Sequence, residues 1–206
     1  HIALRINPDI DAHTHKYITT GKEGNKFGIR YEDALDIYIK ASKMKNIEVV
    51  GVDSHIGSQI LDVAPFKLAA EKMSALIDKL EENGIDIKYI DIGGGLGIKY
   101  TAADKPQKPI DLRKLIMPVY SKYKGKTIIV EPGRAIVGDT GILVGEVLYR
   151  KTSGTKNFII TNLAMTDLIR PALYESYHNV LPVKKSSKKQ QVADIVGPVC
   201  ESSDFI

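Results

Sequence analysis

The chain has 206 residues, enough to bury a core and to fill one domain or one and a half. Hydrophobic residues make up 43% and charged residues 26%, the balance of an ordinary soluble globular protein. The net charge of +4 is mild, and no apolar stretch approaches the roughly 18–20 residues that span a bilayer. We therefore expect neither nucleic acid nor a membrane as a partner.

Three further features concern processing and location. No signal peptide is visible and the chain starts at His1, which indicates processing or an excerpt of a longer polypeptide. The single cysteine, Cys200, excludes an internal disulfide and is typical of a reducing cytoplasm. The lysine-rich stretch over 184–189 has no aromatic residues between its charges, so we interpret it as a solvated hairpin tip.

The hydrophobic pattern predicts alternating strands and helices up to about residue 138. The helix over 65–82 is the clearest, because apolar side chains recur on one face until Asn83 and Gly84 end it. In chain order we predict a strand over 2–6, a polar loop over 11–28, a helix over 31–44, a strand over 47–52, the helix over 65–82, a strand over 87–92, a helix over 111–123 interrupted by Pro118, and a strand over 127–130.

This alternation predicts an α/β fold with parallel strands and covered faces. Only about four strand–helix units are present, so we expect the later strands of a partial (β/α)8 TIM-type barrel. After Gly138 the pattern changes to strands separated by turns, over 141–149, 157–161 and 191–196, which predicts the start of an antiparallel β-domain. The predicted domains are the C-terminal portion of the barrel at 1–138 and part of a β-domain at 139–206.

A glycine-rich bend follows the predicted strand over 87–92. Residues 93–97 read Gly-Gly-Gly-Leu-Gly, too rich in glycine for the interior of a strand or helix. Without Cβ atoms in the way, backbone N–H groups can converge on an anion, which predicts phosphate binding. A plain strand-to-helix turn is the alternative. The spacing matches neither the dinucleotide fingerprint nor a Walker A loop.

A histidine and a serine follow the predicted strand over 47–52. His55 offers a flat ring that can stack on a planar cofactor, and Ser58 offers a hydroxyl for its phosphate. The alternative is a buried histidine whose hydrogen bonds are satisfied inside the protein. The glycine-rich bend one unit later favours the cofactor-binding interpretation.

Two charges held in a turn follow the predicted strand over 127–130. Residues 131–134 read Glu-Pro-Gly-Arg, in which the proline fixes φ and the glycine permits a sharp turn. A carboxylate such as Glu131, fixed against a pyridine nitrogen, keeps the ring protonated and able to accept electrons when a bond to Cα breaks. Arg134 can grip a substrate carboxylate bidentately. An internal Glu131–Arg134 ion pair is the alternative.

The last third of the chain carries further candidates. Arg170 stands just before a proline expected at the first position of a helix, close enough to Tyr174 for both to contact one ligand. A Cys-Glu pair lies in a turn at 200–201, where the alternative to a catalytic thiol is an inert buried cysteine. His13 and His15 lie two apart without a third ligand, so we predict no metal site.

Together these stretches resemble the alanine-racemase-like (fold type III) pyridoxal phosphate (PLP) enzymes, and among them the decarboxylase branch that acts on diaminopimelate. The matching stretches span nearly the whole chain. They read Arg-Ile-Asn-Pro-Asp at 5–9, Asn-Lys-Phe-Gly at 25–28, His-Ile-Gly-Ser-Gln at 55–59, Gly-Gly-Gly-Leu-Gly at 93–97, Glu-Pro-Gly-Arg at 131–134, Arg-Pro-Ala-Leu-Tyr at 170–174 and Gly-Pro-Val-Cys-Glu-Ser at 197–202. The first five are typical of the wider decarboxylase group, and the last two favour the diaminopimelate branch.

The resemblance implies a reaction and residue roles. The reaction is decarboxylation of meso-2,6-diaminopimelate to L-lysine and CO2 in lysine biosynthesis, by a cytoplasmic homodimer with a shared active site. The catalytic residues are Cys200, as proton donor across the dimer interface, and His55, stacked on the pyridine ring. The implied cofactor ligands are His55, Ser58, Gly93, Gly94, Gly95, Glu131, Gly133 and Arg134. The implied substrate ligands are Arg134, Arg170, Tyr174 and Glu201.

The chain departs from the family pattern in two respects. The family links PLP to a lysine on the first barrel strand, and Lys16, Lys26 and Lys99 do not match that motif. We therefore expect these 206 residues alone to be inactive. A tyrosine ligand near the family's C-terminus would lie beyond Ile206. Residues 161–167 read Thr-Asn-Leu-Ala-Met-Thr-Asp where many relatives have Asp-Ala-Gly-Met-Asn-Asp.

Three other functions are compatible with parts of the pattern. A sister PLP decarboxylase of arginine, ornithine or carboxynorspermidine differs in the distal pocket, because only a second substrate carboxylate requires both Arg134 and Arg170. A non-catalytic PLP-binding regulatory protein would differ in lacking the cofactor-linking lysine. A phosphate-binding barrel for sugar phosphates would need neither the Cys-Glu pair at 200–201 nor a stacked His55.

Overall fold

The computed structural model describes residues 1–11, 26–184, 187 and 191–206. Of the features predicted from sequence, the hairpin tip over 184–189 lies largely outside the described residues. The predictions on His13, His15 and Lys16 lie entirely outside them.

The described chain forms two compact units, and each is described by itself. Unit 1 comprises His1–Lys99 and Asp104–Thr140, and unit 2 comprises Tyr100–Ala103 and Gly141–Ile206. The assignment of 1–138 to a barrel and 139–206 to a β-domain stays a prediction.

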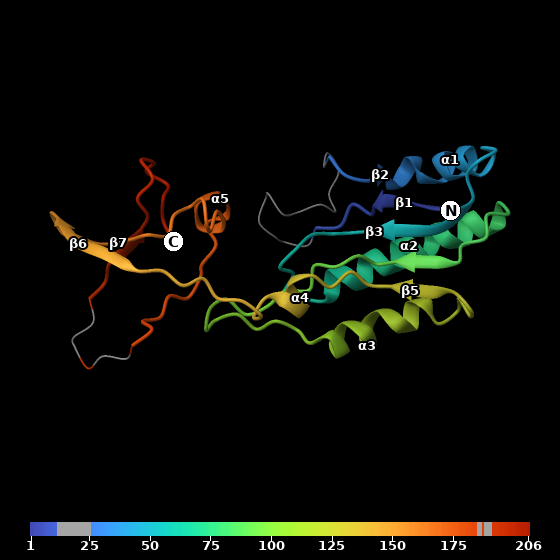
Figure 1. The fold of residues 1–206 in the computed structure, drawn as a ribbon. Helices are drawn as coiled ribbons and strands as arrows, with labels where there is room; N and C mark the ends of the chain where they lie inside the picture. Colours follow the sequence, from blue (N-terminus) through green and yellow to red (C-terminus); the bar gives the residue numbers. More distant parts are fainter. Residues whose placement is uncertain (12–25, 185–186, 188–190) are drawn as a thin grey trace. The chain divides into compact units, whose positions relative to one another are not determined.

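Unit 1 is built on a five-stranded sheet in which every neighbouring pair is parallel (Figure 1). The strand order is β2-β1-β3-β4-β5. The strands are β1 (Ile2–Asn7), β2 (Ile29–Arg30), β3 (Val49–Ser54), β4 (Tyr89–Asp91) and β5 (Thr127–Ile129). The predicted parallel α/β arrangement is confirmed, with the short β2 added at the end of the polar loop. The carboxyl ends of the strands therefore meet at one edge of the sheet.

A helix follows each of the strands β2, β3, β4 and β5. These helices are α1 (Tyr31–Ser42), α2 (Ala64–Glu82), α3 (Pro109–Tyr120) and the short α4 (Arg134–Val137). Helix α2 ends as predicted, with Gly84 at φ +76° in the left-handed region. Helix α3 begins two residues before the predicted position. Pro109 suits a first turn, and the Asp111 carboxylate accepts the Lys108 N–H at 3.1 Å.

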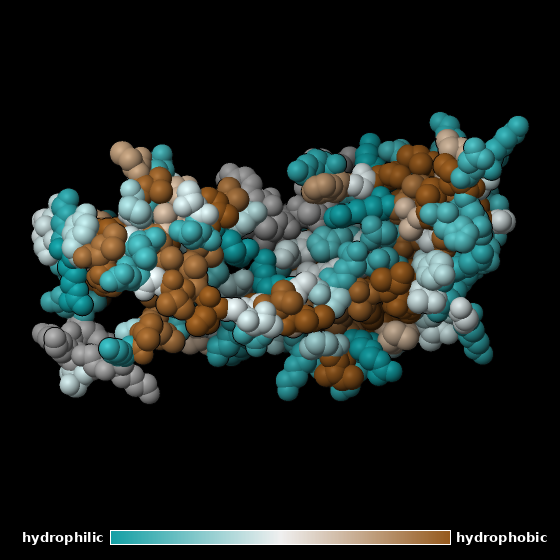
Figure 2. All heavy atoms as spheres, in the orientation of Figure 1, coloured by the Kyte–Doolittle hydropathy of each residue, from teal (hydrophilic) through white to brown (hydrophobic). Residues whose placement is uncertain are grey.

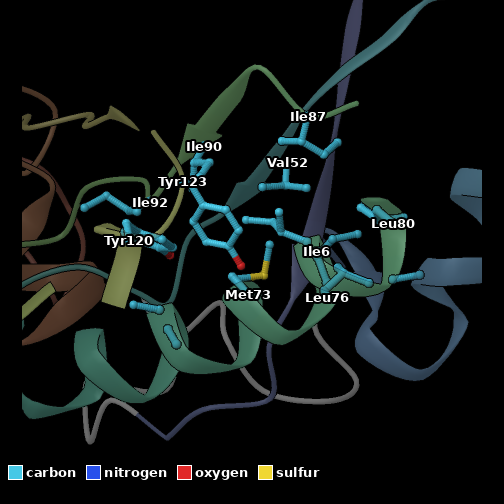
Figure 3. Packing of buried hydrophobic residues seen from close by; sticks show 14 of the residues in the cluster. Ile6, Val52, Met73, Leu76, Leu80, Ile87, Ile90, Ile92, Tyr120 and Tyr123 are labelled. Atoms are coloured by element: carbon cyan, nitrogen blue, oxygen red, sulfur yellow. The ribbon is translucent and has the colours of Figure 1, made fainter. Parts of the chain in front are cut away.

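The hydrophobic core of unit 1 lies between the sheet and its helices (Figure 3). Val52 and Ile90 are register partners on β3 and β4, and both are fully buried. They belong to the same buried cluster as Met73 and Leu76 of α2. Because side chains alternate along a strand, the next row of register partners points to the opposite face. That row places Arg5, Asp53 and Asp91 on neighbouring strands, away from the helices.

Unit 2 contains a three-stranded sheet with strand order β6-β7-β8. Its elements are β6 (Val147–Ser153), β7 (Lys156–Thr161), β8 (Asp194–Val196) and the short helix α5 (Arg170–Tyr174). Strands β6 and β7 are antiparallel, but β7 and β8 are parallel. The prediction of a purely antiparallel region is therefore wrong. Strand β7 ends at Thr161 and β8 begins only at Asp194, and a separation of this length in the chain permits parallel pairing.

Two predicted strands in unit 2 are longer than the observed ones. The strand predicted over 141–149 begins only at Val147, and the strand predicted over 191–196 begins at Asp194. The apolar residues before Val147 are exposed, among them Ile142 at 90% exposure. The apolar residues over 141–146 were therefore wrongly predicted as part of a strand, because among the described residues they have no strand partner.

Apolar side chains reach the surface of unit 2 (Figure 2). Every residue of β6 is exposed, including Val147, Leu148 and Tyr149. The exposed apolar surface of unit 2 therefore includes the first three residues of β6, and the rest of the strand is polar or charged.

Among the described residues, none of the helices has the length and apolarity that a membrane span requires.

The core predicts a contrast between two leucines of α2. Leu76 is 2% exposed and Leu68 is 52% exposed. Leu76→Ala should lower the free energy of unfolding by about 2–5 kcal/mol, because it removes buried methyl groups and leaves a cavity. Leu68→Ala, the matched control, should change it by less than about 0.5 kcal/mol. Urea unfolding followed by circular dichroism measures both, and equal effects would contradict the assigned core.

Candidate functional site

Three loops at the carboxyl edge of the parallel sheet carry most of the candidate residues. His55 follows the last residue of β3, Gly93 lies two residues after β4, and Glu131 lies two residues after β5. These parallel strands are neighbours in the sheet, so the loops that follow them lie side by side. The three motifs recognised in the sequence therefore lie at one edge of unit 1.

Backbone hydrogen bonds join these loops to one another. The Glu131 N–H donates to the Gly93 carbonyl at 2.9 Å, and this bond joins the loops after β4 and β5. The Ile60 N–H donates to the Gly95 carbonyl at 2.9 Å, and the Gly97 N–H donates to the Ile60 carbonyl at 2.9 Å. Those two bonds join the loops after β3 and β4. The loops therefore form one connected surface.

The glycine bend is needed for this close approach. A Cβ added to Gly94 would lie 2.0 Å from the Glu131 carbonyl oxygen, and one added to Gly95 would lie 2.0 Å from the Gly57 carbonyl oxygen. Gly93 and Gly95 also have positive φ, at +68° and +105°. Any larger residue would push the three loops apart.

The amides of the bend are not equally available to an anion. The Gly93 N–H donates to the Asp91 carboxylate at 2.8 Å, and the Gly94 N–H donates to His55 Nδ1 at 3.1 Å. The Gly95 N–H donates to no other described residue. Of the three, Gly95 therefore has the N–H that remains open to an anion, and phosphate binding by Gly93, Gly94 and Gly95 stays a prediction.

His55 is held as a neutral ring. Its Nδ1 accepts the Gly94 N–H, which requires that this nitrogen carry no proton. Burial and then the nearby Arg5 lower the pKa of His55, and Asp91 opposes them only in part. The hydrogen bond and the lowered pKa both indicate a neutral imidazole, which is held in a fixed orientation at this edge of the sheet.

A cluster of three carboxylates lies beside His55. Oxygen atoms of Asp53, Asp91 and Glu131 lie within 4.8 Å of one another. Burial, followed by the charge of Asp91, raises the pKa of Asp53 to about 6, with Arg5 acting in the opposite direction. The sequence analysis gave no role to Asp53 or Asp91. Their position in the sequence could have indicated them, because each is an acidic residue within the last two positions of a strand that leads into a motif.

The Glu-Pro-Gly-Arg turn separates its two charges. Glu131 is exposed and belongs to the carboxylate cluster, whereas Arg134 is the first residue of α4. Arg134 Nη1 donates to the side-chain oxygen of Gln59 at 3.0 Å. The guanidinium is thus anchored on the loop after β3. A Cβ at Gly133 would meet nothing within 4 Å, so crowding does not explain the glycine there.

Unit 2 carries the remaining predicted residues. Arg170 is the first residue of α5, with Pro171 following it inside the first turn and not at the helix start as predicted. Its guanidinium carbon lies 5.5 Å from the ring centre of Tyr174 and 5.8 Å from that of Tyr100. The expected neighbourhood of Arg170 and Tyr174 is therefore present, with Tyr100 as a third member that the sequence did not reveal.

Cys200 and Glu201 are exposed in a turn that a buried carboxylate organises. Asp204, 3% exposed, accepts the Met165 N–H at 2.6 Å and the Val199 N–H at 2.8 Å. These bonds fix the turn against the stretch over 161–167, where the chain departs from its relatives. Ser58, in unit 1, is half-buried on the loop that carries His55.

Residues 1–138 match the family model described as "Pyridoxal-dependent decarboxylase, pyridoxal binding domain". The chain belongs to this family of pyridoxal-dependent decarboxylases. The groups gathered in unit 1 fit its cofactor: a neutral flat imidazole, a carboxylate for a protonated ring nitrogen, and a glycine bend with an available N–H.

The chain is similar to diaminopimelate decarboxylases in particular. It is 50% identical to that of Aquifex aeolicus over 100% of this chain and 49% of the relative, and 45% identical to that of Haemophilus influenzae with the same coverage. The crystal structure of diaminopimelate decarboxylase from Helicobacter pylori complexed with L-lysine is 41% identical, with a TM-score of 0.91 over 99% of this chain and 50% of that one. The chain spans about half the length of the curated relatives it matches.

The close loop approach predicts that Gly94 does not tolerate a side chain. Gly94→Ala would force apart the loops after β4 and β5, since its Cβ overlaps the Glu131 carbonyl. We expect a loss of about 2 kcal/mol or more of unfolding free energy, as for other steric insertions. Gly141→Ala, whose Cβ meets nothing within 4 Å, is the control and should stay within about 0.5 kcal/mol. A tolerated Gly94→Ala variant would contradict the packing of the loops.

The carboxylate cluster predicts a pH-dependent gain in stability on Asp53→Asn. The pKa of Asp53 is about 6 in the folded protein against an ordinary 3.8, so folding holds its proton more tightly. The wild type therefore loses stability as pH rises from about 4 to about 6. Above pH 6 the variant should be more stable by about 1 kcal/mol, a value reduced because water reaches part of the carboxylate.

The measurement is urea unfolding of both proteins between pH 4 and pH 8. The difference should shrink towards pH 4, where the wild-type carboxyl group is protonated in the folded state and close to its ordinary pKa of 3.8 in the unfolded state. Asp36→Asn, on the exposed face of α1, controls for the removal of one negative charge. A difference that stays the same across the pH range would show that ionisation of Asp53 is not its cause.

Proposed function

We propose that this chain is part of a PLP-dependent carboxy-lyase that converts meso-2,6-diaminopimelate to L-lysine and CO2. The observation that carries the proposal is the joining of the loops after β3, β4 and β5 at one edge of a parallel sheet. Those loops bring together an imidazole, a glycine bend and a carboxylate, the groups that a charged pyridine ring with a phosphate requires. The names of the similar proteins support diaminopimelate as the substrate.

The proposal includes a fold and an assembly. Unit 1 would form the later strands of a (β/α)8 barrel, and unit 2 the start of a β-domain. The parallel strand order and the chemistry at the carboxyl edge support the barrel. We propose a cytoplasmic homodimer with a shared active site, and the single Cys200 is consistent with a reducing compartment.

PLP, when bound, supplies a ring that takes up the electrons released as the α-carboxylate leaves. In this chain, Glu131 would hold a proton on the ring nitrogen, and the neutral His55 would stack on the ring face. The Gly95 N–H and the Ser58 hydroxyl would bind the phosphate. Gly93 and Gly94 keep the bend in shape, since their own amides bind Asp91 and His55.

The remaining residues would bind substrate and move a proton. Arg134, Arg170 and Tyr174 would bind the distal carboxylate, because guanidinium groups pair with carboxylates in a bidentate manner. The Cys200 thiol would donate a proton to the carbon that has lost CO2, and the resulting thiolate would regain one from water. Glu201 would contact the substrate beside it.

The proposal predicts a substrate preference that can be measured directly. The complete polypeptide of the gene that encodes these residues should release CO2 from meso-diaminopimelate and form L-lysine. Ornithine and arginine, which lack the second carboxylate, should react at least about 100-fold less efficiently, because two half-buried guanidinium groups would be left without their partner. The isolated 206 residues should show no turnover, because none of their lysines matches the cofactor-linking motif. Turnover by the isolated chain, or equal turnover of ornithine, would refute this assignment.

A further inference from the structure

Gln59 is not among the predicted cofactor or substrate ligands, yet its side-chain amide makes three hydrogen bonds. Its Nε2 donates to the Ile98 carbonyl at 2.6 Å, and its Oε1 accepts the Ile98 N–H at 3.2 Å. The same Oε1 accepts from Arg134 Nη1 at 3.0 Å. One side-chain amide therefore joins the loop after β3, the chain after the glycine bend, and the first residue of α4.

The two bonds to Ile98 fix which way the amide points. A side-chain amide has a donor end and an acceptor end, and Ile98 offers a carbonyl to one and an N–H to the other. Turned over, the amide would place oxygen against oxygen and N–H against N–H. The acceptor is therefore directed by the backbone of Ile98, and Arg134 binds to an oxygen whose position is already set.

The surrounding backbone is strained in the same place. Gln59 has a φ of +59°, a left-handed conformation that costs a non-glycine residue about 1 kcal/mol or more. A Cβ on Gly138 would lie 2.4 Å from Ile98 Cδ1 and 2.7 Å from the Arg134 carbonyl oxygen. Glycine at 138 thus lets the Ile98 side chain approach the end of α4, the four-residue helix that Arg134 begins. Ile98 therefore lies against α4 as well as against the Gln59 side chain.

We propose that Gln59 is a positioning residue that holds the Arg134 guanidinium in the orientation in which it binds the distal carboxylate of the substrate. The inference rests on the proposed function, because it assigns that carboxylate to Arg134. Gln59 itself is not expected to touch the substrate. As an uncharged acceptor it orients the guanidinium without neutralising it, which a carboxylate at the same place would do.

The test measures ligand binding by the complete polypeptide with its cofactor. L-lysine, the expected product, keeps the distal carboxylate, whereas 1,5-diaminopentane carries both amines and no carboxylate. Gln59→Leu should weaken L-lysine binding about 10-fold or more, the equivalent of one hydrogen bond to a charged group. It should leave the diamine affinity and the absorbance spectrum of the bound cofactor unchanged. Gln107→Leu, the same change at an exposed position of unit 1, should alter neither affinity.

A double-mutant comparison shows whether Gln59 acts through Arg134. In an Arg134→Gln background, adding Gln59→Leu should weaken L-lysine binding by less than about 2-fold, because the guanidinium is already absent. Should Gln59→Leu fail to fold, Gln59→Glu keeps the size and one acceptor. It should bind L-lysine weakly at neutral pH and recover at acid pH relative to wild type, as the introduced carboxylate gains a proton.

The outcomes separate this inference from the proposed function. A wild type that neither turns over diaminopimelate nor binds L-lysine would refute the proposed function. A wild type that does both, with Gln59→Leu unchanged or with equal losses for L-lysine and the diamine, would refute the role of Gln59. An undiminished effect of Gln59→Leu in the Arg134→Gln background would refute it as well.

Discussion

The Gly93–Gly95 bend requires three backbones to lie closer together than any side chain permits. Carbonyl oxygens of Gly57 and Glu131 occupy the positions where the Cβ atoms of Gly95 and Gly94 would stand. This approach lets the Glu131 and Ile60 N–H groups bond to the bend, so that the loops after β3, β4 and β5 share one network. The bend thereby bonds to both sides of the candidate site, because the Gly94 N–H donates to His55 Nδ1 and the Gly93 carbonyl accepts the Glu131 N–H.

The balance of charge follows from the same geometry. Parallel strands in register place Arg5, Asp53 and Asp91 in one row, and the loop contact adds Glu131 to it. One guanidinium faces three carboxylates, so full ionisation of all three is unfavourable in a partly buried place. The raised pKa of Asp53 reflects this excess, together with its burial.

The sequence predicted those parts of the structure that depend on local chemistry. The periodicity of α2 and its Asn-Gly end, the parallel strands and the three motifs at strand ends all follow from residues close together in the chain. The missing parts depend on distant partners. The Gln59 side chain bonds to Arg134, 75 positions away in the chain, and to Ile98, 39 positions away. No sequence pattern near residue 59 predicts either contact. The false strand over 141–146 has the same origin, since an apolar run becomes a strand only where another strand pairs with it.

Both units fix a turn that carries candidate site residues with one polar side chain that binds main-chain groups. In unit 1 the Gln59 amide binds the N–H and carbonyl of Ile98, and in unit 2 the Asp204 carboxylate binds the N–H groups of Met165 and Val199. The choice of group follows from what the turn carries. A carboxylate suits the turn of Cys200, where only donors must be satisfied and the candidate residues are a thiol and an acid. A carboxylate beside Arg134 would instead neutralise the charge that the proposed distal contact requires, whereas the Gln59 amide holds the guanidinium without adding a negative charge.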